Sequence, residues 1–235
     1  TCESSKSFAG VTRSAVAGVN PALIIAHPVA QAQDAILMPV HPEQKATGMG
    51  WFIAIIGIIS TVASYLLARD GYLLAAEGQT PSCDINPFFS CGNVMESWQA
   101  RLFFDAPNQL LGIAGWAVVS TVGVGLIQGA QFRRWFWWAS TIGLFSAWFF
   151  LMWLFVQAAF SIGFLCLYCM VVWVTHTILW WVYLPWALSQ GLLTSHPRAI
   201  ALGQATLPFA WVPIVATFAT IVLAVWVQFP LLFSF

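Results

Sequence analysis

Five long apolar segments constrain how this chain can fold, because each is suited to the interior of a lipid bilayer. A helix crosses the hydrocarbon core with about 20 predominantly apolar residues. Five stretches of the sequence meet that requirement: residues 49–68, 109–127, 135–159, 162–184 and 209–229. We therefore predict an all-α integral membrane protein with five transmembrane helices in one membrane domain.

The amino-acid composition agrees with a lipid environment and argues against one class of partner. Of the 235 residues, 60% are hydrophobic and 7% are charged, whereas soluble domains carry about 25% charged residues. The 14 Trp and 19 Phe residues suit the aromatic belts at membrane surfaces. Eight basic and eight acidic side chains give a net charge of zero, so there is no electrostatic basis for nucleic-acid binding.

The first 48 residues differ from the rest of the chain and predict a disordered cytoplasmic leader. Their longest apolar patch, residues 21–26, is too short to cross a membrane. A signal peptide is the competing interpretation. We disfavour it because Lys6 and Arg13 lie far apart and the apolar region is interrupted. Cys2, within this leader, receives no role.

Basic residues indicate how the five helices are oriented. Six of the eight basic residues fall on the side of the N-terminus: Lys6, Arg13, Lys45, Arg133, Arg134 and Arg198. The other side receives Arg69 and Arg101 together with five acidic residues. Because cytoplasmic loops carry the excess of Lys and Arg, we predict a multi-pass protein of the plasma membrane with a cytoplasmic N-terminus. The fourth span then begins on the outer side.

A pair of cysteines stands at the head of the fourth span. Cys166 and Cys169 are three residues apart within the apolar run 161–184, so a helix places both thiols on one face. If Ser161 or Gly163 begins the helix, Cys166 lies in its first turn or two, where the helix dipole favours the reactive thiolate. Two thiols at this spacing also form an easily reduced disulfide. The pair therefore indicates redox chemistry.

A long segment on the predicted outer side, residues 70–108, carries a second pair of cysteines. Cys83 and Cys91 are separated by seven residues rich in turn-forming side chains. Ser90 is a good N-cap, and apolar residues recur after it at four-residue spacing: Val94, Trp98 and Leu102. We predict one short amphipathic helix that lies on the membrane surface as a lid over the bundle. Cys91, at its start, then also favours the thiolate.

Two other interpretations of these four cysteines remain open. The four cysteines could form two static disulfides that stabilise a structural membrane protein on its oxidising side. Four cysteines would also bind zinc, for which pairs two residues apart are common ligands. We disfavour zinc because the wider spacing of Cys83 and Cys91 is unusual for zinc ligands and the other pair is embedded in lipid. We therefore predict no metal.

His176 is a second polar candidate within the fourth span. It lies seven residues after Cys169, on roughly the same helix face. An ionisable residue inside a membrane is a candidate for a haem ligand or a proton relay. We favour a neutral, hydrogen-bonded histidine near the core of the bundle.

Taken together, these residues resemble the vitamin K epoxide reductase family. The matching features are Cys83-Asp84, Ser90-Cys91-x-x-Val94-x-x-Ser97, Asn108, Gly112 and Cys166-x-x-Cys169. The resemblance covers residues 51–184 and is nearest to bacterial members with five spans and no fused thioredoxin domain. It implies a four-helix bundle, residues 49–184 with the outer loop 70–108, around a quinone site. Residues 185–235 then form a cytoplasmic loop and a fifth transmembrane helix.

The resemblance also implies a role for each cysteine. Cys83 and Cys91 look like the shuttle pair that exchanges disulfides with a soluble, exported, thioredoxin-fold partner of the DsbA type. A thiol of the shuttle pair, with Cys91 the nearer candidate, would attack Cys166. Cys169 would face the quinone ring and donate to it.

Two further residues correspond to quinone contacts of the family. Asn108 matches an asparagine that hydrogen-bonds a quinone carbonyl. Trp173 stands where the human-type enzymes have a tyrosine, and its indole N–H is able to donate in place of the phenol. Menaquinone is the expected quinone, because the Ala- and Trp-rich composition hints at an actinobacterium-like source.

Redox chemistry favours one direction for such a relay. Quinones are generally more oxidising than protein dithiols, and each exchange passes through a mixed disulfide. We therefore expect electrons to flow from partner thiols through Cys83/Cys91 and Cys166/Cys169 to the quinone, which supports disulfide formation in exported proteins. The alternatives are a quinone or quinone-epoxide reductase that consumes external thiols, and a structural protein with static disulfides.

Overall fold

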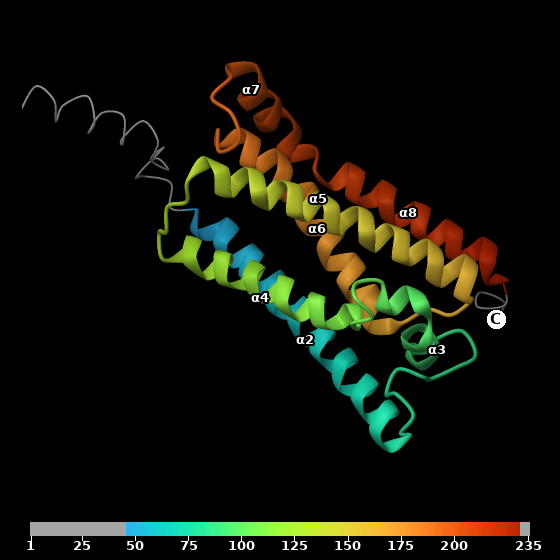
Figure 1. The fold of residues 1–235 in the computed structure, drawn as a ribbon. Helices are drawn as coiled ribbons and strands as arrows, with labels where there is room; N and C mark the ends of the chain where they lie inside the picture. Colours follow the sequence, from blue (N-terminus) through green and yellow to red (C-terminus); the bar gives the residue numbers. More distant parts are fainter. Residues whose placement is uncertain (1–45, 231–235) are drawn as a thin grey trace, which may run out of the picture. The chain divides into compact units, whose positions relative to one another are not determined.

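A computed structural model describes residues 46–230 of the chain. Within that range five helices are long and apolar enough to cross a membrane, as predicted (Figure 1): α2 (Thr47–Glu77), α4 (Asn108–Ile127), α5 (Arg134–Val156), α6 (Leu167–Ser189) and α8 (Trp211–Gln228). The all-α, multi-pass membrane fold is thus confirmed. Of the predicted leader, residues 1–45 lie outside the described part of the chain.

Shorter helical segments connect these spans. Between α2 and α4 lie α3 (Cys91–Glu96) and the 3₁₀ turn η1 (Trp98–Arg101). The π-helical turn η2 (Gln157–Ile162) extends α5. The connection from α6 to α8 contains α7 (Pro197–Thr206) and the 3₁₀ turn η3 (Leu207–Phe209).

Helix α2 continues through residues 70–77, which the sequence assigned to the loop. Its 31 residues span about 46 Å, more than the roughly 30 Å of hydrocarbon. Arg69 and Asp70 therefore mark where the helix leaves the apolar zone, but they do not end it. It ends at Gly78, whose φ of 66° is left-handed and whose N–H donates to the Leu74 carbonyl at 3.1 Å.

Helix α6 begins later than predicted, at Leu167 rather than near residue 162. The π-helical turn η2 ends at Gly163, whose φ of 79° is left-handed and whose N–H donates to the Ala158 carbonyl at 2.9 Å. The chain then runs without helix to Cys166. The peptide groups just before Cys166 are therefore available for partners outside α6.

Helices α2 and α4 lie side by side and pack closely along their length (Figure 1). A Cβ on Gly57 of α2 would lie 2.7 Å from the Ser120 backbone nitrogen of α4, and a Cβ on Gly123 of α4 would overlap Ala54 of α2. Small residues let membrane helices approach each other in this way.

Four of the spans, α2, α4, α5 and α6, surround a cavity of about 640 Å³. Helix α6 packs on α2 and on α5, whereas α4 and α5 make little contact with each other. A buried hydrogen bond of 2.7 Å joins Ser60 of α2 to Thr175 of α6. The fifth span, α8, packs on α6 and η2. The site thus lies within a group of four helices, with α8 outside it.

We predict that Gly57→Ala lowers stability by about 1–3 kcal/mol, because the added methyl group meets backbone atoms of α4 that cannot move aside. The measurement is thermal unfolding of the purified protein in detergent. Gly48→Ala is the matched control on the same helix, since nothing lies within 4 Å of a Cβ at Gly48. Equal melting temperatures for the two variants would contradict the packing described.

Candidate functional site

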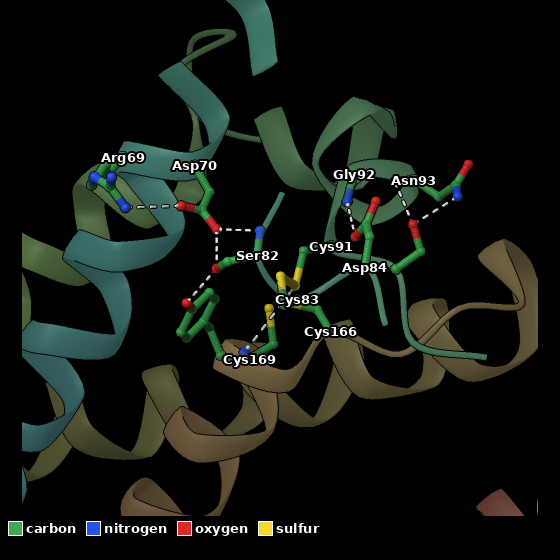
Figure 2. The surroundings of a disulfide bond; sticks show 12 residues. Arg69, Asp70, Ser82, Cys83, Asp84, Cys91, Gly92, Asn93, Cys166 and Cys169 are labelled. Atoms are coloured by element: carbon green, nitrogen blue, oxygen red, sulfur yellow. Dashed lines mark hydrogen bonds and ion pairs between the residues drawn. A yellow bond between two sulfur atoms is a disulfide. The ribbon is translucent and has the colours of Figure 1, made fainter. Parts of the chain in front are cut away.

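The four cysteines of the described chain meet where the loop between α2 and α4 approaches the start of α6 (Figure 2). Cys83 and Cys91 form a disulfide, with their Cα atoms 5.8 Å apart. Cys166 and Cys169 are free thiols. The Asp84 carboxylate lies beside the disulfide sulfurs, but the S–S bond takes up both sulfurs, so this cluster does not form a metal site in the state described.

Ser90 is the N-cap of α3, as predicted, and Cys91 is its first residue. The Ser90 hydroxyl accepts a hydrogen bond from the Asn93 backbone N–H at 3.3 Å. The Asp84 carboxylate accepts from the Gly92 N–H at 3.1 Å. Two of the N–H groups that begin a helix are thereby satisfied, and the position of Cys91 is fixed.

The prediction of one amphipathic helix through Leu102 is wrong, because α3 ends at Glu96. Ser97 adopts an extended conformation, and its hydroxyl donates to the Val94 carbonyl at 2.6 Å. Serine competes with helical hydrogen bonding in this way. The chain resumes as the separate turn η1, where Trp98 is largely exposed.

Two backbone hydrogen bonds align the loop with the chain that leads into α6. The Ser90 N–H donates to the Leu165 carbonyl at 3.0 Å, and the Leu165 N–H donates to the Phe88 carbonyl at 2.9 Å. The two donors, Ser90 and Leu165, directly precede Cys91 and Cys166 in the sequence. As a result the Cys91 and Cys166 sulfurs lie 3.2 Å apart, with both residues fully buried.

Cys166 is the N-cap of α6, rather than a residue within its first turns. The Cys169 backbone N–H donates to the Cys166 sulfur at 3.4 Å. Hydrogen bonds from the Cys169 side chain and backbone lower the pKa of the Cys166 thiol, and they outweigh burial, which raises it. The helix N-terminus also favours an anion at this position. Cys166 is therefore the more nucleophilic of the two free thiols.

Every sequence-predicted site residue except the disulfide pair lines the cavity between the four spans: Asn108, Cys166, Cys169 and Trp173. Asn108 donates through Nδ2 to the Gln99 carbonyl at 2.7 Å, and its Oδ1 is buried with no partner. The indole N–H of Trp173, a residue 4% exposed, also lacks a partner in the described chain. Two more lining residues carry a buried polar atom without a partner in the described chain, Trp137 at its indole N–H and His176 at Nδ1. The apolar cavity lining thus has two unpaired acceptors, on Asn108 and His176, and two unpaired donors, on Trp137 and Trp173.

Sequence reasoning missed two amides that also line this cavity. Gln99, on η1, is buried, and its Nε2 donates to Oε1 of Gln157 at 3.3 Å. Gln157 is a polar residue near the end of the third apolar segment, which was a signal available in the sequence. The sequence held no such signal for Gln99, because nothing distinguished it from the exposed polar residues of the loop. Together the two amides tie η1 to the end of α5.

His176 has the environment that we favoured for it. It is 1% exposed, and its Nε2 lies 3.0 Å from the Leu144 carbonyl, which makes Nε2 the protonated nitrogen. Its ring meets Trp116 edge to face, with centroids 5.3 Å apart. The interpretation as a hydrogen-bonded core histidine is confirmed.

Comparison with known proteins gives one result. The model of the vitamin K epoxide reductase family matches residues 51–184, more than half of the chain. No curated protein and no solved structure matches this chain. The family's membrane fold and redox-active cysteines correspond to the helices and thiols described above. The chain belongs to the vitamin K epoxide reductase family, whose members are membrane oxidoreductases that act on disulfides and quinones.

Proposed function

We propose that this protein is a quinone-dependent thiol oxidase that supports disulfide formation in exported proteins. The observation that carries the proposal is the contact of 3.2 Å between a disulfide sulfur, on Cys91, and a free thiol, on Cys166. Static disulfides would require no such contact between an oxidised and a reduced pair. Thiol–disulfide exchange requires it, because a thiolate must reach the sulfur that it attacks.

The relay begins at the loop pair. A thiolate of the partner attacks Cys83, because Cys91 already faces Cys166. A partner–Cys83 bond forms, and Cys91 leaves as a thiolate. The partner's second thiolate then attacks its own bonded sulfur, which closes the partner's disulfide and releases Cys83. The partner has lost two electrons, and the loop pair has gained them.

The second exchange passes these electrons inward. The Cys91 thiolate attacks Cys166 of a Cys166–Cys169 disulfide and releases Cys169. Cys83 then attacks Cys91, which closes the loop disulfide and releases Cys166. The state described, with the loop pair closed and the inner pair free, corresponds to the end of this exchange. Cys166 and Cys169 next close their own disulfide and give up two electrons and two protons.

A membrane quinone, which accepts two electrons and two protons when bound, is the proposed oxidant. The cavity of about 640 Å³ falls within the usual range for ligand sites. Trp173 Nε1 suits a quinone carbonyl as a hydrogen-bond donor, and so does the second N–H of Asn108. The unpaired Oδ1 of Asn108 suits a hydroxyl of the reduced form. We propose menaquinone as the quinone.

The proposed topology has the cysteines outside the plasma membrane and the N-terminus in the cytoplasm. Arg133 and Arg134 lie at the start of α5, and Arg198 lies at the start of α7, at the ends of the spans away from the cysteines. This charge distribution supports a cytoplasmic location for that end. The thiol partner is then an exported thioredoxin-fold protein of the DsbA type.

We predict that Cys91→Ala traps the partner in cells. In this variant the Cys83 thiolate attacks the disulfide of an oxidised partner molecule, so a Cys83–partner bond forms and the partner's second cysteine leaves as a thiolate. The variant has no thiol of its own at position 91 to displace the partner, so the mixed disulfide accumulates. Non-reducing electrophoresis followed by mass spectrometry identifies the trapped protein. Cys83→Ala is the comparison and should trap less, because its Cys91 remains against Cys166. Capture of no thioredoxin-fold protein by either variant would refute the proposed partner class.

We predict that Cys169→Ala lowers quinone reduction by more than about a hundredfold, because the inner pair can no longer close its disulfide. The assay follows menaquinone absorbance with purified protein and a reduced dithiol partner. Cys2→Ala, which removes a cysteine with no assigned role, is the matched control. Undiminished turnover in Cys169→Ala would show that this thiol does not deliver the electrons.

We predict that Trp173→Phe raises KM for the quinone about tenfold while kcat changes little, since one hydrogen-bond donor is lost from a buried site. Trp148→Phe is the control, because the Trp148 indole N–H is also unpaired but does not line the cavity. Equal KM values for the two variants would remove Trp173 from the quinone site.

A further inference from the structure

A buried carboxylate on α2 lies next to the loop pair without contacting either cysteine (Figure 2). Asp70 is 4% exposed, and its Oδ2 accepts two hydrogen bonds from Ser82, from the backbone N–H at 2.9 Å and from the hydroxyl at 2.5 Å. Its other oxygen, Oδ1, lies 3.7 Å from Nη1 of Arg69, whose side chain is largely exposed. Ser82 directly precedes Cys83, so the hydrogen bonds to Asp70 fix the backbone just before the disulfide.

Ser82 also connects to the inner pair. Its hydroxyl lies 2.8 Å from the hydroxyl of Tyr168, which stands between Cys166 and Cys169. Because the Ser82 hydroxyl gives its proton to the Asp70 carboxylate, the Tyr168 hydroxyl donates to Ser82. The Asp70–Ser82–Tyr168 chain therefore joins α2, the residue before Cys83 and the first turn of α6.

The two loop cysteines are held by different means. Cys91 is fixed by backbone hydrogen bonds to Leu165 and by the capped start of α3, and these do not depend on redox state. Cys83 is held by the disulfide itself, by Asp84, which binds back to the same loop, and by Ser82. Apart from apolar packing around Leu67, only the Ser82 hydrogen bonds link Cys83 to the membrane helices once the disulfide opens.

We propose that Asp70, Ser82 and Tyr168 act as positioning residues that keep the Cys83 thiol close to Cys91 while their disulfide is open. The proposal deepens the thiol-oxidase function and rests on it. The step served is the resolution of the Cys91–Cys166 mixed disulfide. There the Cys83 thiolate attacks Cys91, the Cys83–Cys91 bond forms, the Cys91–Cys166 bond breaks, and Cys166 leaves as a thiolate with no net oxidation.

The first test is independent of quinone turnover. In fully reduced wild-type protein, the alkylation rates of Cys83 and Cys91 are measured by peptide mapping. Ser82→Ala should expose Cys83 and raise its rate about tenfold, as expected for losing hydrogen bonds to a charged acceptor, and leave Cys91 unchanged. Ser82→Thr, which keeps the hydroxyl, should restore the slow rate. Tyr168→Phe should give an intermediate rate.

Thr80→Ala is the matched control, because Thr80 is an exposed hydroxyl residue of the same loop that makes no hydrogen bond in the described structure. Asp70→Ala, compared with Glu77→Gln on the same helix, tests the buried carboxylate. Ser82 itself is exposed, so Ser82→Ala is informative even if Asp70→Ala fails to fold. Equal Cys83 alkylation in Ser82→Ala and Thr80→Ala overturns the proposal.

The second test uses turnover with partner and quinone, stopped by acid. Ser82→Ala should accumulate the Cys91–Cys166 mixed disulfide and lower kcat, with KM for the quinone unchanged. Faster Cys83 alkylation without this accumulation also overturns the proposal, because the contacts would then serve stability alone. Absence of quinone reduction by the wild-type protein would refute the oxidase function instead, so the two failures are distinguishable.

Discussion

The contact between Cys91 and Cys166 depends on a short backbone pairing, in which Leu165 bonds to Phe88 and Ser90. That pairing exists only because α6 begins at Leu167. Had the helix begun near residue 162, the amide and carbonyl of Leu165 would have been used within it. The left-handed turn at Gly163 therefore makes the redox contact possible, although Gly163 is not itself part of the site.

The surrounding bundle meets a different requirement, which is to enclose an apolar cavity next to reactive thiols. Helices α2 and α4 pack at glycine contacts, and α6 bridges α2 and α5. Because α4 and α5 make little contact, space remains between the four spans. Hydrogen bonds from Gln99 to Gln157 and from Asn108 to the Gln99 carbonyl then attach η1 to two of these spans at the cysteine end.

The features that the sequence predicts well are those set by local chemistry. Hydropathy alone located the five spans, and residue type alone identified Ser90 as an N-cap. The late start of α6 was missed because hydropathy does not detect a π-helical turn within an apolar run. The break at Ser97 was missed because spacing does not register a side chain that competes for a backbone carbonyl. Contacts between distant segments, such as Asp70 with Ser82, had no local signal.

The same geometry serves both directions of electron flow, and this follows from the chemistry of the contact. Exchange between Cys91 and Cys166 breaks one S–S bond and forms another, so its free energy depends on the difference between two dithiol potentials, with about 30 mV equivalent to 1.4 kcal/mol. A lowered pKa at Cys166 makes it both a thiolate nucleophile and a good leaving group. The contact thus keeps the exchange reversible, and the redox potential of the ligand in the cavity relative to that of the thiol partner drives it in one direction.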